Sequence, residues 1–134
     1  PSLFEQALKS YNEGAPLSEV IASFQQITQQ DPRLSAGWTC LAWLQLLDNQ
    51  AQSALRSARM AVKLTPQDPQ ARINLSLAML ENNVKGVREH IELVQRVRVM
   101  APEIGEELDS SIADGLARRP DWQALQKVKA WLHG

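Results

Sequence analysis

Apolar residues recur at helical spacing along the whole chain, and turn-forming residues divide the pattern into eight segments. Within 86–100, for example, Val87, Ile91 and Val94 fall on one helical face. No segment shows the strict apolar–polar alternation that is typical of strands. The pattern predicts an all-α fold with helices over 2–13, 17–30, 35–47, 51–64, 69–81, 86–100, 104–117 and 121–132.

Short turn signals mark the ends of these segments. Asp68 followed by Pro69 is a strong start signal, because the Asp side chain can cap free N–H groups and proline gives up a donor that the first turn does not use. Other boundaries come from Gly14 with Pro16, Asp31 with Pro32, Asp48 with Asn49, Asn82 with Asn83, and Pro120 with Asp121. No linker or low-complexity segment interrupts the pattern, so we expect one domain over 1–134.

The apolar pattern also repeats at long range, with Pro32 and Pro66 standing 34 residues apart. The segment that ends at Pro66 has Trp38, Leu41, Ala42, Ala54, Ala58 and Ala61 at fixed offsets. The first segment matches it with Phe4, Ala7, Leu8, Tyr11, Val20, Phe24 and Ile27, and the third with Leu75, Ser76, Met79, Val94, Val97 and Pro102. Arg72 stands where the third segment would have its Trp. A period of this length is typical of stacked helical hairpins.

This pattern resembles the tetratricopeptide repeat, a helix-turn-helix unit of the same length. The resemblance covers residues 2–102, with repeats at about 1–34, 35–68 and 69–104 and a degenerate capping hairpin at about 105–134. It implies a right-handed superhelix of helix pairs, a tetratricopeptide solenoid of about eight helices. In that family the first helix of each pair lines a concave groove that commonly holds a peptide or helix of another protein.

Carried onto this chain, the resemblance implies a groove with an apolar middle. Partner contact is expected at Lys9, Thr39, Cys40, Trp43, Leu46, Leu47, Gln70, Ile73, Asn74, Leu77 and Leu80, and Glu5, Asn12 and Glu81 complete the lining. An apolar groove favours an amphipathic helix or an apolar extended segment. We expect Trp43 to be the anchor, because a Trp among aliphatic neighbours is typical of a binding hot spot.

Chaperone-tail binders of this family hold a C-terminal carboxylate with a clamp of Lys, Asn and Arg side chains. The matching positions here are Glu5, Lys9, Cys40, Gln70 and Asn74. Without converging cations, such a carboxylate would lose its charge-assisted hydrogen bonds. Binding to chaperone tails is therefore not expected.

Two alternatives to an open groove remain. The chain's own C-terminal segment, with Trp122, Leu125 and Leu132, could cover the apolar surface, since monomers seldom leave a large apolar patch bare. A homodimer could bury the same surface. In either case partners would dock elsewhere, through the convex face or through the acidic seventh helix, which carries Glu103, Glu106, Glu107, Asp109 and Asp114.

Composition narrows the functional classes. The 134 residues include 14 basic and 15 acidic side chains and one cysteine, so nothing favours a polyanion partner or an internal disulfide, and a cytoplasmic setting is the default expectation. No apolar run approaches the ~20 residues of a membrane span, and the first residues lack the pattern of a signal peptide. We expect neither membrane insertion nor a secretory leader.

Candidate chemistry is sparse. His90, His133 and Cys40 have no partner at metal-ligand or catalytic spacing, so we expect no enzyme activity, metal or cofactor. A basic stripe could form from Arg56, Arg59, Lys63, Lys85, Arg88, Arg96 and Arg98. Because the net charge is near zero and no aromatic residues interleave with the cations, nucleic-acid binding is not expected. The sequence predicts a non-enzymatic adaptor or assembly factor.

Overall fold

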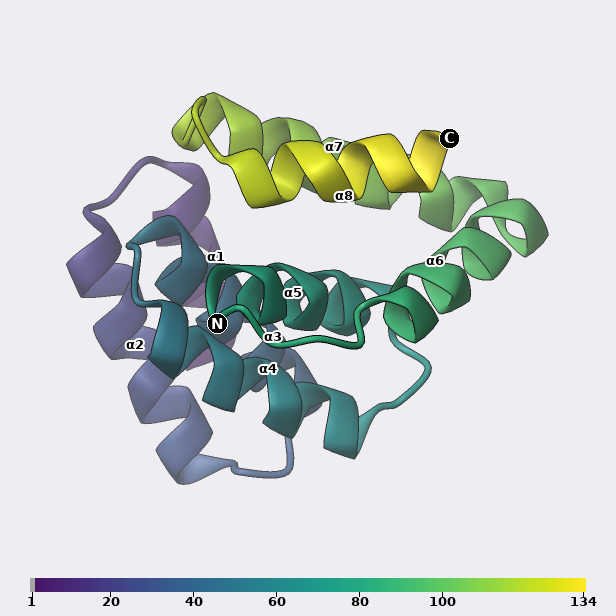
Figure 1. Ribbon diagram of the computed structural model, residues 1–134. Helices are drawn as coiled ribbons and strands as arrows, with labels where there is room; N and C mark the ends of the chain where they lie inside the picture. Colours follow the sequence, from purple (N-terminus) through teal and green to yellow (C-terminus); the bar gives the residue numbers. More distant parts are fainter. Residues whose placement is uncertain (1) are drawn as a thin grey trace.

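Residues 2–134 are described by a computed structural model, and over that range the chain forms eight helices and no strand (Figure 1). The helices are α1 (Leu3–Asn12), α2 (Leu17–Gln30), α3 (Ser35–Leu47), α4 (Ala51–Leu64), α5 (Pro69–Glu81), α6 (Arg88–Met100), α7 (Pro102–Arg118) and α8 (Gln123–His133). The all-α prediction is confirmed.

Helices α6 and α8 begin two residues later than expected, and α7 begins two residues earlier. Gly86 has φ of 106°, a left-handed conformation that cannot belong to an α-helix, so α6 begins after it. Pro102 occupies the first position of α7, where its missing N–H costs nothing. At α5 the predicted cap is confirmed, with the Asp68 side chain accepting a 3.0 Å hydrogen bond from Gln70 N.

The backbone repeats its local geometry from one helix pair to the next. The turns after α1, α3 and α5 each contain a residue with positive φ, namely Gly14, Asn49 and Asn83. The residues that end α2, α4 and α6 share φ of −136° to −137° and ψ of 76° to 81°; they are Asp31, Thr65 and Ala101. Each precedes a proline, which disfavours the helical conformation in the residue before it. These two kinds of turn, one within each helix pair and one after it, give the three helix pairs a common shape.

Arg72 takes the place of Trp38 in the next helix pair and makes the same hydrogen bond. Trp38 Nε1 donates to Pro32 O at 2.8 Å, and Arg72 Nε donates to Pro66 O at 2.8 Å. The half-buried Trp38 ring also packs against the core of the first pairs. The Arg at this position therefore preserves the repeat's polar contact while losing the aromatic packing.

Helices that follow one another in the chain pack against each other from α1 to α8. The seam between α3, α4 and α5 is lined by the small residues Ala42, Ala54, Ala58 and Ala61, all 0% exposed. Small side chains there allow the backbones to approach closely. Figure 1 shows α7 and α8 side by side across one side of the other helices, and α8 packs on α5 and α6.

Candidate interaction site

The C-terminal helices cover the apolar middle of the predicted groove. Leu46 of α3 and Ile73 and Leu77 of α5 are 0% exposed and belong to one core cluster with Trp122 and Leu125. Of the alternatives that the sequence leaves open, covering by the chain's own helices is the arrangement found in the structure. The expectation of an apolar surface free for a partner is wrong for four positions, which are Leu46, Leu47, Ile73 and Leu77.

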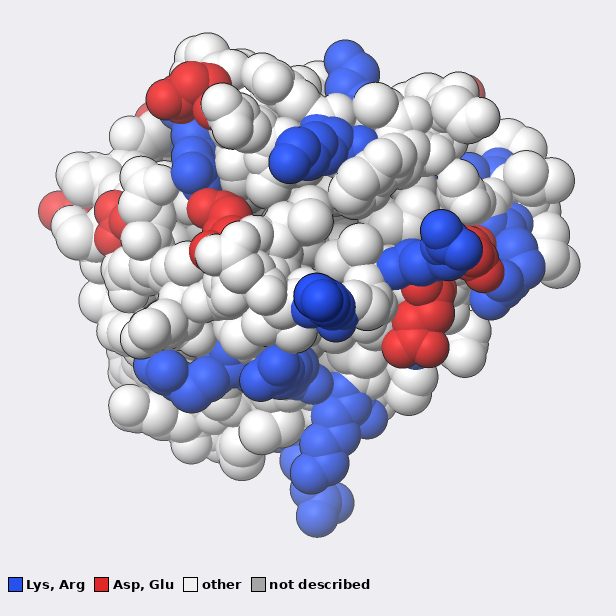
Figure 2. All heavy atoms as spheres, viewed as in Figure 1, with Lys and Arg blue, Asp and Glu red and all other residues white. Residues whose placement is uncertain are grey.

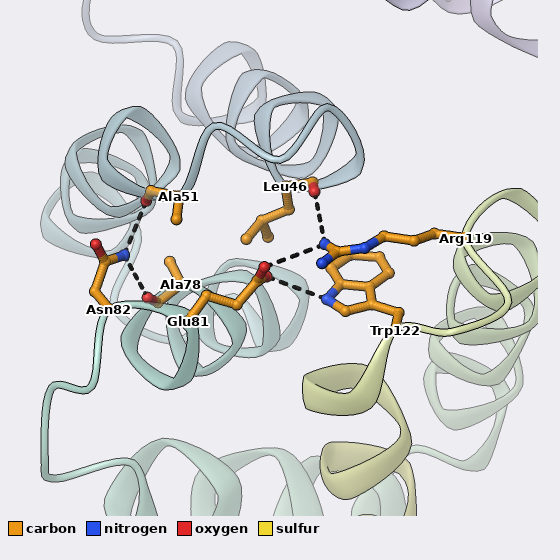
Figure 3. Close-up of polar contacts among 7 residues, drawn as sticks. All are labelled: Leu46, Ala51, Ala78, Glu81, Asn82, Arg119 and Trp122. Carbon is orange, nitrogen blue, oxygen red and sulfur yellow. Dashed lines mark hydrogen bonds and ion pairs between the residues drawn. The ribbon is translucent and has the colours of Figure 1, made fainter.

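The turn between α7 and α8 is fixed to the ends of α3 and α5 (Figure 3). Glu81, the last residue of α5, accepts hydrogen bonds from Arg119 Nη1 and Trp122 Nε1, each at 3.1 Å. Arg119 Nη1 also donates to Leu46 O at 2.9 Å, near the C-terminus of α3. A cation at the C-terminal end of a helix is favoured by the helix dipole. Polar contacts therefore hold the covering hairpin in place beside its apolar contacts.

A second set of contacts joins α7 to α1. The Tyr11 hydroxyl donates to an Asp114 carboxylate oxygen and accepts a 3.0 Å hydrogen bond from Trp43 Nε1. Arg118 lies over the Tyr11 ring, 3.8 Å from its centroid, and Arg118 Nε bonds to Asp114 Oδ1 at 3.0 Å. Burial and then the bond to Asp114 raise the pKa of Tyr11 well above its usual value. Helix α7 is thus attached at both edges of the covered groove.

Gly115 lets α7 approach Trp43 closely. A Cβ at this position would lie 2.7 Å from Leu125 Cδ2 and 2.8 Å from Trp43 Cη2. The Trp43 ring also contacts Trp122, with ring centroids 5.4 Å apart. The expected anchor residue Trp43 is therefore half-buried against the chain's own C-terminal helices.

A pocket of about 180 Å³ remains where α1, α3, α5 and α7 meet. Its lining is largely apolar, and it includes five of the predicted groove residues: Thr39, Cys40, Trp43, Gln70 and Asn74. The other lining residues are Leu8, Tyr11, Phe24, Leu44, Ser111 and Asp114. The structure therefore brings part of the predicted site together and moves its centre toward the N-terminal pair of helices.

The contributions of Ser111 and Asp114 were missed by sequence reasoning, because they come from the helix that covers the groove. Six predicted groove residues lie outside the pocket. Lys9 is exposed on α1, Leu80 lines a separate hollow beside Trp122, and the other four are the buried residues Leu46, Leu47, Ile73 and Leu77.

The polar groups at the pocket wall already bond to one another. Asn74 Nδ2 donates to Thr39 O at 2.9 Å, and Asn74 Oδ1 accepts from Gln70 Nε2 at 2.9 Å. A fully buried Asn that is satisfied on both sides rigidifies its surroundings. Asn74 thus fixes the spacing between α3 and α5. Apolar contact is what the pocket offers a ligand.

Cys40 at the pocket and His90 on α6 both favour their uncharged forms. Burial, followed by repulsion from Asp68, raises the pKa of the Cys40 thiol to about 12, so the thiol stays protonated near neutral pH. Burial and then the Arg72 guanidinium lower the pKa of His90, and Arg72 Nη1 donates to His90 Nδ1 at 2.7 Å. Over residues 2–134 no group of three or more His, Cys, Asp or Glu side chains is placed to hold a metal ion. Within the same residues no helix has the length and apolar character needed to cross a membrane.

No family model matches the chain, and no curated protein matches its sequence. The tetratricopeptide resemblance therefore depends on the residues and on the repeated local geometry of the three helix pairs.

Proposed function

We propose that this chain is a non-enzymatic protein-interaction module of the tetratricopeptide type. In this proposal α1 to α6 form three repeats of a superhelix, and α7 and α8 form a cap that fills most of the concave groove. The partner is a protein segment that places one apolar side chain in the remaining pocket. The observation that carries the proposal is the largely apolar pocket of about 180 Å³ beside Trp43, which opens to solvent.

The size of the pocket sets the size of the anchor. An engineered apolar cavity of ~150 Å³ in another protein binds benzene, so a pocket of this volume accommodates one Phe, Leu or Met side chain. The apolar wall from Leu8, Phe24 and Leu44 supplies contacts for such a group. Because α7 and α8 occupy the apolar middle, a helix of ~20 residues along the whole groove does not fit without displacing them. A short extended segment is the better match.

The adaptor role also agrees with the state of the titratable groups. A nucleophilic thiol needs a lowered pKa, and Cys40 has a raised one. A general base needs access to substrate, and His90 is buried with its Nδ1 occupied by Arg72. These observations support a binding role over a catalytic one.

A peptide-display selection tests the proposal, with a matched pair of variants on α7. Ser111 lines the pocket, whereas its neighbour Ser110 is exposed. Ser111→Leu fills the pocket, and Ser110→Leu adds the same apolar surface outside it. We expect selected peptides to share one large apolar residue, to lose at least about tenfold in affinity for Ser111→Leu, and to bind Ser110→Leu nearly as the wild type, since tenfold is only ~1.4 kcal/mol.

Peptides without a common apolar residue, or an equal loss with both variants, would contradict the proposal. Circular dichroism of both variants is the control for helix content. An unchanged spectrum with selective loss at Ser111→Leu assigns the effect to the pocket.

A further inference from the structure

Large apolar side chains are exposed on one stretch of surface away from the pocket. At the end of α6, Val99 is 81% exposed and Met100 is 83% exposed, and on α8 Trp131 is 40% exposed. Burying such groups releases free energy in proportion to their apolar area. Exposed groups of this size close to one another are typical of an interaction surface.

Trp131 lines a hollow between α6 and α8, and Val99 and Met100 line a shallow neighbouring hollow formed by α6 alone. A hollow of about 510 Å³ is lined by Val87, Arg88, Ile91, Glu92, Gln95, Ala130, Trp131 and Gly134. At one end it shares Glu92 and Gln95 with a hollow of about 380 Å³ that reaches Val99 and Met100. At the other end it shares Val87 with a hollow of about 770 Å³ between the α5–α6 turn and the start of α8. We call the three together the α6–α8 furrow.

The α6–α8 furrow carries an excess of positive charge. Lys85, Lys127, Arg88 and Arg96 line it, and none of the four is in an ion pair among the described residues. Two unpaired carboxylates also line it, those of Asp121 and Glu92, so four cations against two carboxylates leave an excess of two. Figure 2 views the face that bears α8, where Lys and Arg side chains lie among Asp and Glu side chains; the cations in its lower part lie over α4, outside the α6–α8 furrow.

Arg98 does not belong to this charged surface, although the sequence places it in one basic stripe with Arg88 and Arg96. Its guanidinium is half-buried, donates to Leu132 O at 2.9 Å and pairs with Asp109 at 3.2 Å. This contact joins α6, α7 and α8. Arg98 therefore stabilises the packing of the helices that form the α6–α8 furrow. The positive charges available to a ligand are those of Lys85, Arg88, Arg96 and Lys127.

We propose that the α6–α8 furrow binds an acidic amphipathic helix of a partner protein. The apolar face of that helix would cover Trp131, Val99 and Met100, and acidic residues beside that face would meet Arg88, Arg96, Lys85 and Lys127. Helix α6 has 13 residues. At 1.5 Å per residue it offers ~20 Å of contact, which matches three to four turns of a partner helix.

A second copy of this chain is a poorer occupant. Its acidic helix is α7, and there Asp109 and Asp114 already pair with Arg98 and Arg118. The exposed residues of α7 carry no large apolar side chain; they are Pro102, Glu103, Glu106, Glu107, Ser110, Ala113, Ala117 and Arg118. Such a helix matches the charge of the α6–α8 furrow but leaves Trp131 and Met100 without an apolar partner.

Two labelled peptides test this inference. Both have about four helical turns with leucines along one face; one has glutamates beside the leucines and the other has lysines. The protein variants are Arg88→Glu with Arg96→Glu in the furrow and, as a matched control, Arg59→Glu with Lys63→Glu on α4. Both pairs are exposed and change the net charge equally. Fluorescence anisotropy measures binding at two salt concentrations.

We expect the glutamate peptide to bind, with an affinity that falls as the salt concentration rises. The lysine peptide should bind at least about tenfold more weakly, a difference of ~1.4 kcal/mol. The α6 double variant should bind the glutamate peptide at least about tenfold more weakly than the wild type, and the α4 double variant less than about twofold more weakly. Met100→Ser, which removes an exposed side chain and leaves the fold intact, should also weaken it several-fold. Equal binding of both peptides, or equal loss with both charge variants, would overturn the inference.

Two further outcomes would overturn it in favour of another occupant. Displacement of the glutamate peptide by a single-stranded oligonucleotide of equal charge, at equal concentration, would indicate a nucleic-acid surface. Sedimentation equilibrium that shows a dimer in the wild type and a monomer in Met100→Ser would indicate a second copy of this chain.

Discussion

Trp122 and Glu81 are 41 residues apart in the chain, and Trp122 Nε1 donates a 3.1 Å hydrogen bond to Glu81 Oε2. The other carboxylate oxygen accepts from Arg119 at 3.1 Å, and the Arg119 guanidinium lies 4.9 Å from the Trp122 ring centroid. One carboxylate at the end of α5 therefore receives both donors of the α7–α8 turn. This relationship explains how a hairpin outside the three helix pairs is held over the groove.

Replacing Glu81 tests this attachment. Glu81→Ala leaves the indole N–H of the fully buried Trp122 without an acceptor and removes the ion-pair partner of the half-buried Arg119, which keeps its bond to Leu46 O. We therefore expect a loss of about 1 to 3 kcal/mol of unfolding free energy. Glu81→Gln keeps one carbonyl acceptor and should therefore lose less unfolding free energy than Glu81→Ala. Urea unfolding followed by circular dichroism measures both. Equal stability of Glu81→Ala and the wild type would contradict the attachment.

Two glycines of α7 form a matched pair. Gly115→Ala would place a methyl group 2.8 Å from Trp43 Cη2, so overpacking should cost about 1 to 3 kcal/mol. At Gly105 a Cβ meets nothing closer than 3.7 Å, so Gly105→Ala should stabilise the helix by about 0.5 to 1 kcal/mol. Thermal unfolding should shift in opposite directions for the two variants. A shift in the same direction would show that α7 does not approach Trp43 as closely as described.

His90 should make stability depend on pH. Burial and Arg72 lower its pKa in the folded protein, with a smaller opposing effect from Glu89, whose carboxylate lies 3.8 Å away. The unfolded chain therefore takes up a proton first as the pH falls below ~6.5, and stability is lost on acidification from there toward the folded-state pKa. His90→Gln should show a shallower loss between about pH 7 and 5.5. Parallel slopes for the two proteins in urea titrations would contradict the assignment.

Much of the fold follows from local sequence patterns. The turn residues Gly14, Asn49 and Asn83 and the residues before Pro32, Pro66 and Pro102 fix the helix ends through backbone conformation, which neighbouring residues largely decide. The sequence therefore predicts the eight helices closely. It is less exact at Gly86 and Pro102, where a left-handed turn and a proline start move the boundaries by two residues, and at α8, which begins two residues later than expected.

The candidate site is harder to predict, because it depends on contacts between distant segments. The positions of Thr39, Cys40, Trp43 and Gln70 in the pocket follow from their helix faces. No local pattern states that Gly115 meets Trp43 or that Asp114 meets Tyr11, since those contacts depend on the angle at which α7 crosses the other helices. The apolar stripe of Trp122, Leu125 and Leu132 indicates that this face is buried, but it does not specify which helices the face packs against.

The most direct test of the proposed binding mode follows the indole N–H groups of Trp43 and Trp122 by nuclear magnetic resonance while a selected peptide is added. Trp43 lines the pocket, and Trp122 bonds to Glu81 beneath the covering hairpin. We predict that the Trp43 indole resonance shifts with peptide and that the Trp122 indole keeps its position and its protection from hydrogen exchange. Loss of protection at Trp122 would show that the partner displaces α7 and α8, and an unchanged Trp43 resonance would show that it binds outside the pocket; either result contradicts the account.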